Sequence, residues 1–239
     1  MRAVLADPRY VPVPAGAGGA VGSMAWLRSA VARFSHGPDH ARRRAIVEAE
    51  LAAIDPERLR AAAAREAHPV GEAAAGEGLP ARGARPADQI AVAVLAEALG
   101  VGDVDGVVGS VPAVATVYLS PGDDAAERAA DSAVAVLVKL LGGEPDERVA
   151  NRIGLLVQAY AATAGLVRAA VARGSVADGL RDEPPVRSTR RVATVDTSLA
   201  AAGDTLVLDL AAAGMPFGGE PRVCPGREHA LAIARGVAR

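Results

Sequence analysis

The chain has 239 residues, of which 51% are hydrophobic and 23% are charged. This composition is typical of a globular protein and excludes disorder or a collagen-like structure for the chain as a whole. The 26 basic and 28 acidic residues give a net charge of −2, and only 3% of residues are aromatic. These values argue against nucleic acid as a partner, because phosphate binding needs a concentrated basic face and single strands need aromatic stacking platforms.

Nothing near the N-terminus resembles a targeting signal. Arg2, Asp7 and Arg9 interrupt the apolar core that a signal peptide needs. The longest uncharged apolar stretch lies between Arg152 and Arg168. It is short for a membrane span and better predicts a buried core helix. We therefore expect one cytoplasmic domain, residues 1–239, without membrane association.

Most of the chain carries helical signals. A short apolar turn, a Pro-rich extended segment and a Gly-rich link open the sequence. Apolar spacing and capping residues then predict helices over 23–34, 37–54, 56–67, 86–99, 107–119, 125–141, 146–172, 176–181 and 227–239. Residues 68–85 are predicted to form a loop, and alternation predicts short strands over 189–195 and 205–210. The expected class is mainly α with a small β portion.

The only cysteine, Cys224, lies in a Gly- and Pro-rich loop directly before the last predicted helix. A single thiol cannot by itself form an internal disulfide, a structural zinc site or an iron–sulfur cluster. Backbone N–H groups at a helix start favour the thiolate, which is a suitable axial ligand for a heme iron. A nucleophile and an inert thiol are the alternatives.

This loop resembles the heme-binding loop of the cytochrome P450 superfamily. Phe217, Arg222, Cys224 and Gly226 match its pattern in register, whereas Glu220 stands where glycine is usual. The resemblance implies that Cys224 is the proximal iron ligand of heme b (iron protoporphyrin IX). It also places Arg222 beside a heme propionate, Phe217 beside the sulfur, and Gly226 in the cofactor-binding loop.

Other segments resemble the same family in the same order. His40 and Arg44 are four residues apart and share one helix face. The resemblance implies that both reach heme propionates, as does Arg191 in the first strand. Asp178 and Arg181 occupy the positions of a Glu–Arg pair that forms an internal salt bridge in the family. Aspartate is one methylene shorter, and charge pairs at this spacing are usually surface features.

The helix over 151–165 resembles the one that crosses the distal heme face in this family. Aligned through Thr163, the catalytic acid position is Ala161 and the catalytic alcohol position is Ala162. Thr163 comes one residue late, which is about 100° around an α-helix. The usual proton relay is therefore expected to be missing. A buried core helix would show the same small residues.

The resemblance implies a shortened cytochrome P450-like fold with helices around a heme. Family members are longer; their first helices and sheet, part of the substrate lid and the meander before the Cys loop are missing or reduced here. The implied function is a heme-thiolate oxidoreductase, similar to monooxygenases, with a small organic substrate and a ferredoxin-type redox partner. The missing relay favours peroxide use (a peroxygenase) or a non-oxygenase heme reaction.

Two other functions fit parts of this sequence. A non-catalytic heme-binding or protein-interaction protein derived from a cytochrome P450 is the alternative, and the shortened regions favour it. A cysteine hydrolase has weak support, because His229 follows Cys224 by five residues and no ordered triad surrounds them.

Overall fold

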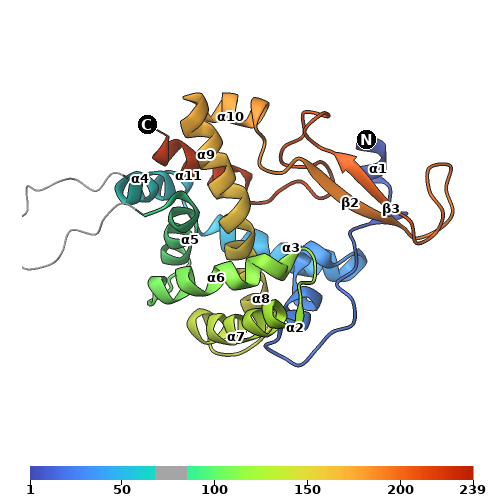
Figure 1. Cartoon of the computed structure of the whole chain (residues 1–239), viewed down its shortest axis with the longest axis horizontal. Coiled ribbons are helices and arrows are strands. Elements are labelled where there is room, and N and C mark those ends of the chain that lie inside the picture. The colour runs from blue at the N-terminus through green and yellow to red at the C-terminus, as the bar shows by residue number, and fades with distance from the viewer. Residues whose placement is uncertain (68–84, 239) are drawn as a thin grey trace, which may run out of the picture.

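The computed structural model describes residues 1–67 and 85–238. The predicted loop at 68–85 lies outside the described residues except for Arg85. Helices dominate, with one small sheet, which confirms the predicted class (Figure 1). The elements are α1 (Arg2–Ala6), β1 (Tyr10–Val11), α2 (Met24–Ala30), η1 (Ala32–Phe34), α3 (Gly37–Ala52), α4 (Pro56–Ala67), α5 (Ala87–Ala98), α6 (Val104–Tyr118), α7 (Asp124–Leu141), α8 (Glu147–Gln158), η2 (Ala159–Thr163), α9 (Ala164–Arg173), α10 (Val176–Asp182), β2 (Ser188–Ala193), β3 (Thr205–Asp209) and α11 (Arg227–Val237).

One long helix organises the core. The elements α8, η2 and α9 form a continuous helix of 27 residues, Glu147–Arg173, and its α9 part crosses the centre of Figure 1. Within the described ranges it is the one helix long and apolar enough to cross a membrane, yet half of its apolar window is buried inside the protein. Its side chains Ile153, Leu156 and Leu166 belong to the main hydrophobic cluster. The helix therefore packs as a core element.

Glycines let two segments approach this helix closely. A Cβ on Gly179 would lie 2.8 Å from backbone atoms of Ala169 and Ala170, so α10 rests directly on α9. A Cβ on Gly165 would lie 2.7 Å from the Cβ of Pro185. The small residues in this helix thus have a packing role.

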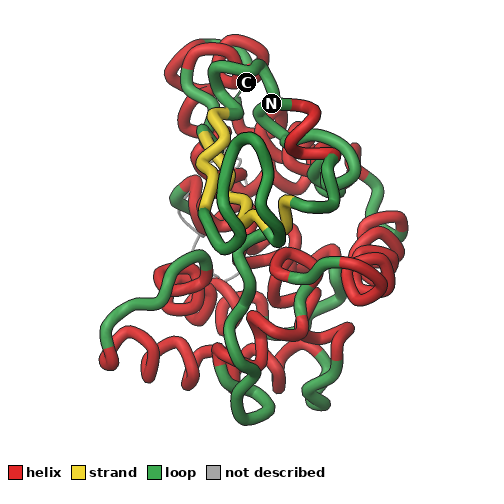
Figure 2. Tube along the Cα trace, turned by 90° about the vertical axis from the view of Figure 1, so that its right-hand side faces the viewer, coloured by secondary structure: helices red, strands yellow, loops and turns green. Residues whose placement is uncertain are grey.

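The sheet carries one site residue. Its strand order is β1-β2-β3, and both pairings are antiparallel. Figure 2 shows the strands gathered in one small sheet, with helices over the rest of the molecule. Arg191 pairs with Leu206 in the ladder and is buried. A second small cluster of Leu5, Leu208, Leu210 and Met215 ties α1 to β3 and the segment after it.

The first predicted helix is shorter than its apolar spacing indicates. It begins at the cap Ser23, which accepts from the Trp26 N–H, but it ends at Ala30. Val31 is extended and η1 follows as a single 3-10 turn. The cause is tertiary: the side-chain oxygen of Asn151, on α8, accepts from the Ala32 N–H at 2.9 Å. That bond supports a break which no local signal marks.

Candidate functional site

The cysteine loop is closed by its own backbone. The Cys224 N–H donates to the Phe217 carbonyl at 2.9 Å, and the Arg222 N–H donates to the Gly219 carbonyl at 3.0 Å. Gly218 has φ of +74°, which an L side chain rarely adopts. These bonds fix the loop directly before α11.

Cys224 is a free cysteine, and as a residue it is exposed. Enough protein surrounds the sulfur to raise the pKa of the thiol by desolvation. A hydrogen bond from the Gly226 N–H and the charge of Arg44 act in the opposite direction. Because desolvation is the largest of these effects, the pKa of Cys224 is raised overall and the neutral thiol is favoured, contrary to the expectation that the helix start favours the thiolate.

The helix α3 brings His40 and Arg44 to this loop. Arg44 donates to the Val223 carbonyl at 2.8 Å, and its Nε lies 2.6 Å from Glu48. His40 is half-buried and lies within reach of the charges of Arg222 and Arg44. Burial first, and these two charges second, lower the pKa of His40 to about 4.

Arg191 and Arg222 reach the same place from β2 and from the cysteine loop. Arg191 is 5% exposed; its Nη1 donates to Thr189 Oγ1 at 2.9 Å, while its buried Nε has no partner in the described part of the chain. Arg222 donates to the Ser35 carbonyl at 2.7 Å. Burial lowers the pKa of Arg222 to about 10, with further lowering by nearby arginine charges.

The donor set of this cluster fits a heme. Burying several cations together is costly unless anions neutralise them. Among residues 1–67 and 85–238, Glu48 is the one carboxylate paired with these four side chains, and it pairs with Arg44. The remaining cations and the free Nε of Arg191 suit a ligand with two carboxylates. Cys224 offers a sulfur, which is one of the axial ligands that hold heme iron in proteins.

Comparison with known proteins resolves the fold. No family model matches the sequence, and no curated protein matches it either. Solved structures do match. P450BioI, in a complex with hexadec-9Z-enoic acid ligated acyl carrier protein, shares 16% identity at a TM-score of 0.74, covering 99% of this chain and 80% of that one. The fold is that of a cytochrome P450.

Two further cytochrome P450-type neighbours agree. CalO2 shares 19% identity at a TM-score of 0.75, over 99% of this chain and 79% of that one. CYP154A1 from Streptomyces coelicolor A3(2) shares 19% identity at a TM-score of 0.71, over 100% of this chain and 80% of that one. With 239 residues, the chain is consistent with a shortened form of this fold. At these identities the likeness establishes the fold alone.

Phe217 and Gly226 flank the cysteine in different ways. Phe217 is half-buried, packs against the main core and carries the Arg227 guanidinium 5.4 Å from its ring centroid. A Cβ on Gly226 would meet only Leu51, at 3.9 Å, among the described atoms. The protein's own packing therefore does not require glycine at this position.

The residues at the acid and alcohol positions lie in a π-helical turn. Ala161 is exposed, Ala162 is half-buried and Thr163 is buried, all within η2. A π-turn closes i to i+5 bonds and absorbs an extra residue. The expectation of a plain α-helix here was wrong, and the 100° rotation assigned to Thr163 does not apply. The side chains at 161 and 162 carry no acid or alcohol.

The Asp178–Arg181 pair forms, but on the surface. Its oxygen and nitrogen lie 2.6 Å apart, with side chains 40% and 66% exposed. The internal bridge implied by the resemblance is therefore wrong for this chain. The reason is geometric: Gly179 faces α9 so closely that positions 178 and 181 are turned outward, where Ser175 also binds Asp178.

Sequence reasoning missed the contacts that join α3 to the long helix. Arg42 and Arg43 bind Glu147 at 2.8 and 2.9 Å, which lowers the pKa of Glu147 to about 2. Arg43 also donates to the Ser35 hydroxyl. The sequence contains one signal for these contacts, which is the run of three consecutive arginines, Arg42 to Arg44. The predicted site uses only Arg44, so the other two arginines were expected to face elsewhere.

His229 is engaged elsewhere. Its Nε2 lies 3.0 Å from the Leu51 carbonyl and 3.1 Å from the Ile54 carbonyl. One N–H between two carbonyls ties α11 to the end of α3. This engagement argues against His229 as the base of a cysteine hydrolase.

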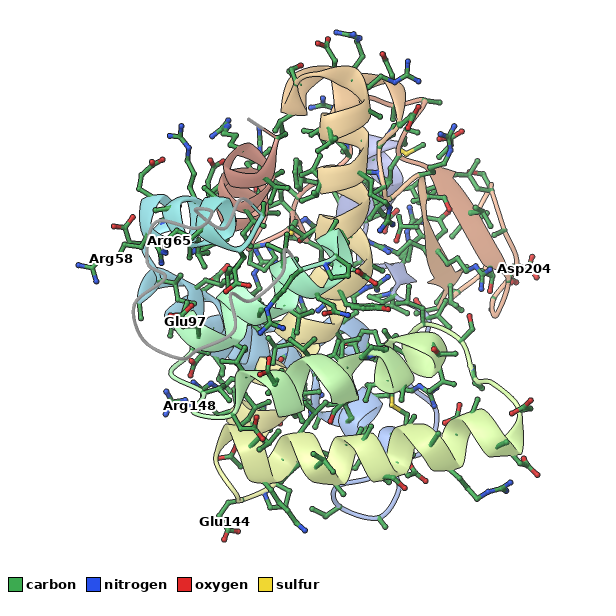
Figure 3. All side chains as sticks on the ribbon, turned by 60° about the vertical axis from the view of Figure 1, so that its left-hand side comes forward. Arg58, Arg65, Glu97, Glu144, Arg148 and Asp204 are labelled. Carbon is green, nitrogen blue, oxygen red and sulfur yellow. The ribbon has the colours of Figure 1, made fainter. Side chains whose placement is uncertain are left out.

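Two cavities lie away from the cysteine. One of about 390 Å³ is lined by Glu66, Arg85 and Glu97 among others, and Glu97 is labelled in Figure 3. The other, of about 500 Å³, is lined by residues of α5, α9 and the chain end, including Ile90 and Val167. None of the lining residues belongs to the cluster around Cys224.

Proposed function

We propose that this chain is a compact heme-thiolate oxidoreductase that acts on a small organic substrate. Cys224 would hold the iron of heme b, and His40, Arg44, Arg191 and Arg222 would hold its propionates. One observation carries this proposal: Cys224 is a free cysteine in the same loop as Arg222, near Arg44 and Arg191, and among the described residues only Arg44 of these three arginines pairs with a carboxylate.

In this proposal each part of the site would have a separate role. The Gly226 N–H and the Arg44 charge stabilise the thiolate of Cys224, and the loop backbone holds it in place. The arginines neutralise and orient the carboxylates. When bound, the heme supplies the oxidation chemistry, whereas the protein supplies binding and orientation.

The distal helix supports an unusual version of this chemistry. Ala161 and Ala162 have no group that holds or moves a proton, and Thr163 is buried in the π-turn. This supports peroxide use, or a non-oxygenase reaction, over oxygen activation with electrons from a ferredoxin-type partner.

The first test is the absorption spectrum of the purified protein. We expect the ferrous–CO complex to show the red-shifted Soret band of thiolate ligation. Cys224→Ala should abolish that band, because it removes the sulfur, whereas Val223→Ala should retain it. Protein that takes up no heme under adequate supply would refute the proposal, and an unchanged Cys224→Ala spectrum would mean a different ligand.

A second candidate is a non-catalytic heme-binding protein or interaction module. The exposed Asp178–Arg181 pair and the missing acid and alcohol favour it. Turnover separates the two candidates: holoprotein with a thiolate spectrum is assayed with hydrogen peroxide and, separately, with a ferredoxin system. Turnover in either assay supports the enzyme, and silence in both supports the second candidate.

A further inference from the structure

Arg33 is a cation that none of the sequence motifs accounts for. It lies in η1 and is half-buried, with its guanidinium carbon 5.7 Å from the ring centroid of Phe34. Among the residues the structure describes, no carboxylate pairs with it. Burial lowers its pKa. A cation in such a place is costly without an anion.

Hydrogen bonds fix the backbone both before and after Arg33. The amide of Asn151, which is 2% exposed, accepts from the Ala32 N–H at 2.9 Å and donates to the Ala30 carbonyl at 3.3 Å. The Ser35 hydroxyl donates to the Val31 carbonyl at 2.7 Å. Arg33 is therefore presented from a fixed turn, as a binding residue needs to be.

Two other arginines converge on this turn. Arg222, from the cysteine loop, donates to the Ser35 carbonyl two residues after Arg33. The charges of Arg191 and Arg33 both act on Arg222, and the charge of Arg33 acts on Arg191. Three guanidinium groups from η1, β2 and the cysteine loop thus lie near enough for their charges to interact.

Tyr118 cannot supply the missing negative charge. Its hydroxyl is buried without a hydrogen-bond partner in the described ranges, and it interacts electrostatically with Arg33. Burial raises the pKa of Tyr118 well above its ordinary value, so the phenol stays neutral at physiological pH. An anion from outside the chain remains the way to compensate the three arginines.

We infer that Arg33, Arg191 and Arg222 form one carboxylate-binding site, in which Arg33 is an additional positioning residue for a heme propionate. Assigning the carboxylate to heme rests on the proposed function. The anion site itself rests on the three converging guanidinium groups and the unpaired Nε of Arg191.

The test compares hemin binding to apoprotein in the wild type, Arg33→Gln and Arg190→Gln. Arg190 is an exposed neighbour of Arg191 and serves as the matched control. Loss of one charge-assisted hydrogen bond should weaken hemin binding about 10- to 100-fold in Arg33→Gln only. With hemin dimethyl ester, whose carboxylates are blocked, wild type and Arg33→Gln should bind equally. If Arg33→Gln weakened binding of the dimethyl ester as much as binding of hemin, the inference would be overturned.

Two readouts without heme separate this inference from the proposed function. Apo Arg33→Gln should melt at the same temperature as the wild type or higher, because a repelling charge is removed; a clear drop would indicate a merely structural role. Inorganic phosphate should stabilise the wild type more than the variant. If the wild type binds no hemin, the proposed function fails. The anion site is then tested by phosphate alone: greater stabilisation of the wild type than of Arg33→Gln supports the site, and equal stabilisation overturns it.

Discussion

At the scale of single residues, the site depends on cations that the folded chain leaves unneutralised. His40 is not one of these cations, but it reports on them, because their charges help to keep its imidazole neutral. The resemblance implies that His40 and Arg222 both lie at heme propionates, and the structure places the two side chains close together although they are more than 180 positions apart along the chain. The low pKa of His40 follows from burial and from those neighbouring charges, so it reports on the state of the whole cluster.

His40 should make apoprotein stability depend on pH. Its pKa is near 6.5 when unfolded and about 4 when folded, so the unfolded chain binds more protons between these values. Stability is therefore retained above pH 6.5 and lost as the pH falls toward 4. His40→Asn should flatten this slope in denaturant unfolding.

The control for this prediction is His36→Asn, an exposed histidine just before the same helix. Its profile should follow the wild type. Parallel slopes for wild type and His40→Asn would show that His40 does not carry the effect. Hemin should also reduce the difference, because carboxylates beside His40 favour its charged form.

At the scale of elements, periodicity and caps located nearly every helix, and the errors have tertiary causes. The first helix stops at Ala30 because Asn151 binds the chain there. The long helix contains a π-turn at Ala159–Thr163 that composition does not reveal. The α9–α10 contact depends on Gly179, whose role is visible only once the two helices are side by side.

Gly179→Ala should therefore destabilise the protein by about 1–3 kcal/mol, because its Cβ would overlap the backbone of α9. Gly109→Ala is the matched control: Gly109 is also helical, but a Cβ there meets nothing within 4 Å. That substitution should stabilise α6 by up to about 1 kcal/mol. Urea unfolding measures both, and equal effects at the two glycines would contradict this account of the α9–α10 packing.

At the scale of the whole molecule, the cytochrome P450 fold persists at 16–19% identity to the neighbours described above. The fold gathers α3, β2 and the cysteine loop around one place. A ligand that binds this place would join three distant segments, so binding and stability should be linked.

Hemin should accordingly raise the melting temperature of the apoprotein. A hundredfold excess over the dissociation constant contributes about 2.7 kcal/mol. For a chain of this size that corresponds to a rise of about 5–10 °C. Differential scanning calorimetry measures the rise, which should shrink in Cys224→Ala. A melting temperature independent of hemin would argue against a built heme site.

The sequence by itself determined the helical class, the cysteine loop and the order of the basic motifs, because caps, periodicity and loop composition act between residues close in the chain. Only the tertiary structure decided that Arg33 joins the cluster, that Asp178 and Arg181 face outward, and that Thr163 ends a π-turn. The physical reason is that the deciding contacts join residues that are far apart in the sequence. A bond such as that from Arg222 to Ser35 joins residues 187 positions apart, and such contacts leave no mark in local sequence.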